Sequence, residues 1–109
     1  SLDNVVVGQI THAVRTTTVD GFDLKEGDII GLDNKKILAK GDGINQVTLD
    51  LIASLKSSTD EVITLYYGED VEEAQAEELQ AMVAEAYPNC DVELQYGGQP
   101  IYYYFISLE

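Results

Sequence analysis

Apolar and polar residues alternate through most of the first 43 positions, a pattern typical of β-strands with one buried face. The segment 5–15 is rich in β-branched residues, and it places Val6, Ile10 and Val14 on one face of the predicted strand. The Asp-Asn-Lys sequence at 33–35 has the composition of a hairpin turn. Further short strands are expected at 16–19, 22–25, 28–32 and 36–40. The N-terminal part of the chain is therefore predicted to be rich in β-structure.

Apolar residues recur at helical spacing in two stretches, 44–55 and 71–87. Asp42 is positioned to cap the first helix, and Asp70 is the expected cap of the second, with Glu73 at the spacing of a capping box. The apolar stripe of the first stretch consists of Ile44, Val47, Leu51, Ile52 and Leu55. We expect two amphipathic helices, at least one of which packs on a sheet.

The segment 62–67 is apolar on both faces, which predicts a central strand covered on both sides. The segment 92–96 alternates apolar with polar residues and is expected nearer the edge of the sheet. Because a helix separates these two strands, they should form a right-handed parallel crossover. A last strand is predicted at 101–108, with Tyr102 and Tyr104 on the same face.

These elements predict an α+β fold, similar to α/β folds, with a mixed sheet and two helices. A β-rich N-terminal part is followed by a β-α-β-β unit. The length of 109 residues fits one domain, so residues 1–109 are interpreted as a single domain, excised from the C-terminal end of a larger protein. No membrane span or secretory signal is expected, because the sequence has no apolar run of about 18 residues and its N-terminus has no basic segment followed by an apolar one.

The net charge of −14 argues against a nucleic acid or an anionic membrane surface as partner, since both require clustered Lys and Arg. The charge is also unevenly distributed. Positions 1–56 hold eight acids and all six basic residues, whereas positions 57–109 hold twelve acids and no Lys or Arg. Two interpretations remain open: the acidity serves solubility, or it guides docking onto a basic protein surface.

Candidate catalytic chemistry is sparse. His12 is the only histidine, and a lone His on an apolar strand face favours a structural role. Cys90 is the only cysteine, so it has no intrachain disulfide partner, and one Cys with one His does not make a zinc site. The sequence contains neither GxGxxG nor GxxxxGK[ST], and no catalytic, cofactor-binding or metal-binding residue is predicted.

The least common local pattern is Gly97-Gly98-Gln99-Pro100 followed by a tyrosine-rich strand. One interpretation is structural: Gly97 and Gly98 supply positive φ, and Pro100 fixes the direction in which the chain leaves the corner. The other is functional: Gln99 donates hydrogen bonds to a partner, with Tyr102 or Tyr104 as an aromatic anchor.

Four motifs along the chain carry a family resemblance. They are T-H-A-V-R-T-T (11–17), V-D-G-F-D-L-K-E-G-D-I-I-G-L (19–32), I-T-L-Y-Y-G-E-D-V (63–71) and G-G-Q-P-I-Y-Y-Y-F-I-S-L-E (97–109). Together they resemble the C-terminal domain of the dihydroxyacetone-kinase-like proteins, a family that includes the catalytic subunit of bacterial fatty acid kinase. The resemblance covers nearly the whole chain, and the closing Gly-Gly-Gln-Pro-x-Tyr motif is its most specific part.

The resemblance implies a cytoplasmic domain that is not an enzyme by itself. In the family, a separate N-terminal domain binds ATP, and this domain would recruit a DegV-like fatty-acid-binding protein whose acyl carboxylate is phosphorylated. Its partners would be that protein and the remaining domains of its own chain. The expected contact residues are Gln99, Tyr102, Tyr104, Glu69, Asp70 and Arg15.

The tail more faintly resembles the second domain of the DegV-like proteins themselves. In those lipid binders a His lies near the ligand, whereas this sequence has Gln99 and Tyr102 in that region. The alternative function is therefore a DegV-like module that binds a lipid or another small molecule.

Overall fold

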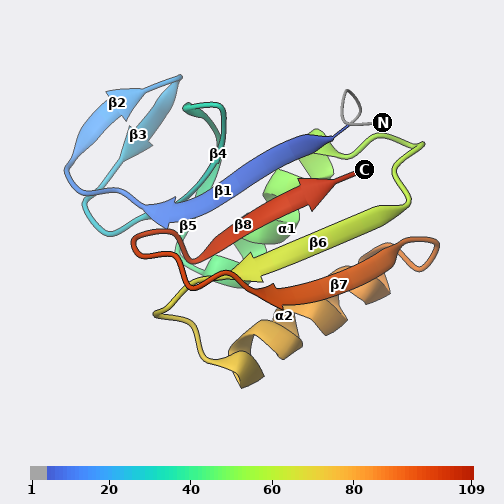
Figure 1. The fold of residues 1–109 in the computed structure, drawn as a ribbon. Coiled ribbons are helices and arrows are strands. Elements are labelled where there is room, and N and C mark those ends of the chain that lie inside the picture. Colours follow the sequence, from blue (N-terminus) through green and yellow to red (C-terminus); the bar gives the residue numbers. More distant parts are fainter. Residues whose placement is uncertain (1–4) are drawn as a thin grey trace.

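The computed structural model describes residues 5–109, which form one mixed six-stranded sheet, a two-stranded sheet and two helices (Figure 1). The strand order of the large sheet is β5-β4-β1-β8-β6-β7. The strands are β1 (Val6–His12), β2 (Thr17–Val19), β3 (Phe22–Leu24), β4 (Ile29–Asp33), β5 (Lys36–Gly41), β6 (Val62–Tyr67), β7 (Asp91–Tyr96) and β8 (Tyr104–Leu108). The helices are α1 (Ile44–Leu55) and α2 (Glu73–Ala86). The predicted α+β class is confirmed.

The last strand joins two parts of the sheet that are far apart in sequence. β8 pairs antiparallel with β1, where Val6 faces Leu108, and antiparallel with β6, where Ile63 faces the same Leu108. β6 and β7 pair in parallel around α2, as the crossover prediction required, and β7 is an edge strand. Residues 6–55 and 62–96 therefore meet in the sheet only through β8.

Both helices lie on the same face of the sheet, behind the strands in Figure 1. α1 contacts β5, β1 and β4, while α2 contacts β7 and β6. α1 lies close to the sheet because Gly8 and Gly31 have no side chain, and a Cβ on Gly8 would be 2.9 Å from Leu51 Cδ2. The main core fills this layer. Its fully buried large residues are Tyr104, Ile10, Leu51, Ile52, Ile63, Leu65, Leu79, Ile106 and Leu108.

The prediction that 62–67 is covered on both faces is wrong in one respect. Ile63 and Leu65 point toward the helices and are fully buried, but Val62, Thr64 and Tyr66 lie on the face that no helix of residues 5–109 covers. Thr64 is nevertheless buried, because Ser107 and Glu93 flank it in register on the two neighbouring strands.

The predicted helix caps are also wrong. α1 starts after Gly43 and α2 after Glu72, and within the described residues neither helix has a side-chain hydrogen bond at its N-cap. Asp42 and Asp70 are exposed in the preceding loops. None of the helices in residues 5–109 is long and apolar enough to span a membrane.

The β2–β3 hairpin forms a second, smaller core cluster at the end of β1 (Figure 1). It packs Leu24 and Phe22 with Ala13, Ile30 and Ile37. Ile30 pairs with Thr11, and Thr11 and Ile30 therefore lie on the sheet face opposite the helices. The hairpin thus shields only the β4–β5 end of that face.

Candidate functional site

The face of the sheet opposite the two helices, here called the open face, is the main candidate for function. Its residues follow from the register: Gln9 pairs with Phe105 on β8 and with Leu32 on β4. Val7, on the same face of β1, is 44% exposed, and Phe105, Gln9 and Leu32 are only partly buried. Half-exposed apolar side chains on an uncovered sheet are a feature of interaction surfaces.

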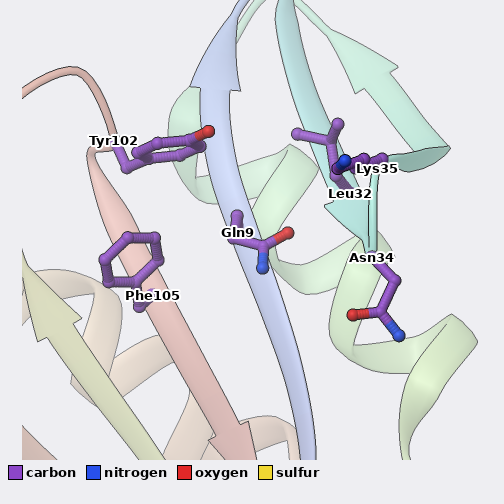
Figure 2. A pocket seen from close by; sticks show the side chains of 6 residues that line it. All are labelled: Gln9, Leu32, Asn34, Lys35, Tyr102 and Phe105. Atoms are coloured by element: carbon purple, nitrogen blue, oxygen red, sulfur yellow. The ribbon is translucent and has the colours of Figure 1, made fainter.

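A hollow of about 530 Å³ lies on this face (Figure 2). Tyr102 and Phe105 stand on one side, Gln9 lies between the two sides, and the β4–β5 turn forms the other side. The residues that line it are Gln9, Leu32, Asn34, Lys35, Tyr102 and Phe105. The aromatic pair is in contact, with ring centroids 5.1 Å apart. The hollow therefore offers apolar walls, two amides and one ammonium group.

Residues 97–103, here called the closing loop, form the rim of the hollow and are held by hydrogen bonds to the end of β6. Gly97 N and Gly98 N both donate to Tyr67 O, at 2.9 and 3.1 Å. Gly68 N donates to Tyr103 O at 2.9 Å, and Glu69 N donates to Gln99 O at 3.0 Å. Gly98 has φ +70°, as the structural interpretation of the corner predicted. The loop is therefore an ordered bracket.

Gln99 has an internal role in this bracket. Its Nε2 donates to Tyr66 O at 3.0 Å and to Tyr102 O at 3.3 Å. Because its amide hydrogens are used inside the loop, Gln99 positions Tyr102 rather than presenting donors to a partner.

Ile101 is the most unusual residue of the closing loop. It has φ +74°, and Tyr102 N donates to Pro100 O at 2.7 Å, so Ile101 is the centre of a γ-turn with positive φ. Thr11 Oγ1 donates to Ile101 O at 2.9 Å and fixes this turn over the open face. A β-branched residue in this conformation costs of order 1–3 kcal/mol. Its side chain is nevertheless 66% exposed, so packing explains little of its presence.

The γ-turn changes the predicted orientation of the tyrosines. A strand that started at 101 would place Tyr102 and Tyr104 on one face. Instead β8 begins at Tyr104, and Tyr102 stacks on Phe105 at the open face. Tyr104 points toward the helices, is 0% exposed, and is not available to a partner. The expectation that Tyr104 is a contact residue is therefore wrong.

The Tyr104 hydroxyl has no hydrogen-bond partner among residues 5–109. β8 lies between the strands that contact α1 and those that contact α2, so the ring fills the space beneath both helices. Burial, with a smaller contribution from Glu78, raises the pKa of Tyr104 to about 12.

The remaining expected contact residues are exposed but lie apart from the hollow. Glu69 and Asp70 follow β6, and Glu69 is tied to the closing loop through its backbone. Arg15 lies in the connection between β1 and β2. Neighbouring Tyr67 donates to Glu73 Oε2 at 3.3 Å, and burial followed by the charge of Glu73 raises the pKa of Tyr67.

His12 and Cys90 have structural surroundings. His12 Nδ1 lies 3.2 Å from the Tyr103 hydroxyl, so this pair links the end of β1 to the closing loop. Cys90 Sγ lies 3.4 Å from Asp60 O, between the loops that precede β6 and β7. Among residues 5–109, no group of three or more His, Cys, Asp or Glu side chains is arranged to hold a metal ion.

Charge on the open face runs from basic to acidic. Lys35 and Lys36 lie at the β4–β5 turn. At the opposite edge Asp91 and Glu93 are exposed on the open face, because the intervening Val92 pairs with core-facing Ile63.

Sequence analysis missed most of the hollow. Gln9, Leu32, Asn34, Lys35 and Phe105 come from three segments that only the sheet register brings together. The one local signal was the hairpin turn at 33–35, whose positive φ at Asn34 and Lys35 (46° and 77°) suits a two-residue turn.

Similarity to known proteins agrees with this description. Residues 1–109 match the FakA-like C-terminal family of fatty acid kinase proteins. Protein YloV of Bacillus subtilis (strain 168) is 36% identical over 109 residues, which is 100% of this chain and 20% of that protein. An uncharacterized protein of Staphylococcus aureus (strain USA300) is 37% identical over 110 residues, with the same shares. The chain thus spans about a fifth of the length of the curated relatives it matches. The chain therefore belongs to the family of FakA-like fatty acid kinase C-terminal domains, as its motifs predicted.

Proposed function

We propose that this chain is a non-catalytic docking domain of a cytoplasmic fatty-acid-kinase-like protein. It holds a DegV-like fatty-acid-binding protein while the ATP-binding part of the longer chain phosphorylates the acyl carboxylate. The observation that carries this proposal is the open face, where a preformed closing loop borders a partly apolar hollow. A rigid loop beside an apolar hollow loses little conformational entropy on binding, which favours affinity.

The charge of the domain supports the same role. Twelve acids and no Lys or Arg occur after position 56, and exposed Asp91 and Glu93 place part of this charge on the open face itself. Such a field would attract and orient a partner with a basic surface around its contact region.

Replacing Tyr102 by alanine tests the proposal, since Tyr102 is the aromatic side chain that the closing loop holds at the hollow. In the full-length parent protein, we expect the Kd for its fatty-acid-loaded DegV-like partner to rise at least about tenfold, the effect of a central aromatic anchor. Isothermal titration calorimetry measures this change.

Tyr96→Ala is the matched control, because Tyr96 is 64% exposed at the end of β7 and does not line the hollow. It removes the same atoms from the surface and should leave the Kd within about twofold. Equal affinity of the Tyr102→Ala variant and the wild type, with both folded by circular dichroism, would contradict the assignment of the open face.

A DegV-like lipid-binding module is the alternative function. It is favoured by one observation, the combination of Leu32, Tyr102 and Phe105 with the Lys35 ammonium group in one hollow, which suits an amphipathic carboxylate. Native mass spectrometry of the full-length protein mixed with fatty acid alone separates the two. Docking predicts no fatty acid bound without the partner protein, whereas the alternative predicts a 1:1 complex that Lys35→Glu abolishes.

A further inference from the structure

Ile101 combines three properties that rarely coincide in one residue. It is apolar and β-branched, it has positive φ, and its side chain is 66% exposed. Glycine would adopt the same backbone conformation without strain. Neither burial nor backbone preference accounts for isoleucine here, and strained residues of this kind cluster at binding sites.

The surroundings of Ile101 fix its position relative to the hollow. The Thr11 hydroxyl holds the Ile101 carbonyl above β1, and Thr11 lies on the same strand face as Gln9. The next residue, Tyr102, lines the hollow and stacks on Phe105 (Figure 2). The exposed Ile101 side chain is therefore a fixed apolar projection at the rim of a fixed apolar depression.

Lys35 adds a charge of defined place. Of the six residues that line the hollow in the described part of the chain, Lys35 is the charged one, and it lies across the hollow from Tyr102 and Phe105 (Figure 2). Its backbone is also held at positive φ in the β4–β5 turn. A cation at this point, in a chain of net charge −14, marks a position where a negative group is favoured.

We infer that Ile101 and the hollow are the two complementary halves of one protein-docking contact: Ile101 enters an apolar depression of the partner, and the hollow receives an apolar partner side chain whose neighbouring carboxylate pairs with Lys35. This inference rests on the proposed docking function and specifies the chemistry of the partner surface. The partner is basic around the contact and carries one carboxylate within it, so the charges fix a single orientation.

Replacement of Ile101 separates binding from folding. In the full-length protein, Ile101→Gly relieves the backbone strain, so the urea denaturation midpoint should equal or exceed that of the wild type. The same change removes the apolar projection, so the Kd for the DegV-like partner should rise at least about tenfold. Ile101→Asn, which also tolerates positive φ, should behave alike, whereas Ile101→Leu should retain wild-type binding. A residue with only a structural role would change stability and affinity in the same direction.

Charge reversal tests the other half of the contact. Lys35→Glu and Lys36→Glu change the net charge equally, and both residues are exposed, but only Lys35 lines the hollow. We expect Lys35→Glu to raise the Kd at least about tenfold and Lys36→Glu to change it less than about threefold. One Asp→Lys or Glu→Lys substitution on the partner should restore binding to Lys35→Glu and weaken binding to the wild type.

The outcomes distinguish this inference from the function on which it rests. Absence of binding between the wild-type protein and the DegV-like partner would overturn the docking function itself. Wild-type binding together with unchanged Kd values for Ile101→Gly and Lys35→Glu would overturn this inference alone. Equal weakening by Lys35→Glu and Lys36→Glu would show a general charge effect and would overturn the paired carboxylate.

Discussion

Replacing Tyr104 by alanine is expected to lower the free energy of unfolding by about 3–5 kcal/mol, the range for large aromatic residues in cores. The ring is 0% exposed and lies on the central strand beneath both helices, so its removal leaves a cavity that both helices border. Tyr104→Phe is expected to do the opposite. It removes a buried hydroxyl that has no partner among residues 5–109, so stability should stay equal or rise by about 1 kcal/mol.

Urea denaturation of the three proteins at neutral pH measures these differences. Alkaline pH provides a second readout, because the pKa of Tyr104 is about 12 in the folded protein and near its ordinary value of 10 in the unfolded chain. The raised pKa means that the contribution of Tyr104 to stability is complete below pH 10 and is lost as the pH rises from 10 to 12. Tyr104→Phe should lack this part of the alkaline loss. A large destabilisation by Tyr104→Phe would instead show that the hydroxyl is hydrogen-bonded.

Gly68→Ala is the second large effect that we expect, about 3 kcal/mol of destabilisation. A Cβ on Gly68 would overlap Tyr102 O and lie 2.7 Å from Gln99 O, and both atoms are backbone carbonyls of the closing loop. Overpacking typically costs about 1–3 kcal/mol, and backbone atoms cannot rotate away as a side chain does, so the upper end applies. The loop must shift, which also weakens the hydrogen bonds from Gly68 N and Glu69 N.

Gly43→Ala is the control for this substitution. Gly43 has φ −115°, and a Cβ there would meet nothing within 4 Å. Its effect should stay below about 1 kcal/mol, most of it from the N-cap position. Thermal and urea denaturation would show the contrast, and amide hydrogen exchange at Tyr103 and Gln99 would place the change in the closing loop. Equal stability of the two variants would mean that the closing loop adapts without cost.

The order and type of the main elements could be read from the sequence because each has a strong local pattern. The helix at 44–55 and the strand at 62–67 were predicted with the bounds that the structure shows. The caps could not be read in this way. Asp42 and Asp70 have the right chemistry, but the chain turns into α1 at Gly43 and into α2 at Glu72, and local chemistry does not fix that turn.

The site was predictable only where it is contiguous. The sequence identified the glycine corner and Tyr102, but regular alternation from 101 would assign Tyr104 to the same face. The positive φ of Ile101 breaks that alternation, and no propensity rule predicts such a conformation for isoleucine. Lys35 and Gln9 join the site through pairing between strands distant in sequence, which a single sequence does not encode locally.

The central place of β8 also has a consequence for synthesis in the cell. The sheet positions on either side of it are made first, and residues 6–55 and 62–96 cannot be joined until residues 104–108 have left the ribosome. Until then β1 and β6 each present an unpaired edge beside an apolar face, the kind of surface that chaperones bind and that aggregates. A nascent chain halted before Tyr104 would carry two half-sheets, and quality control would meet an incomplete product rather than a slightly weakened domain.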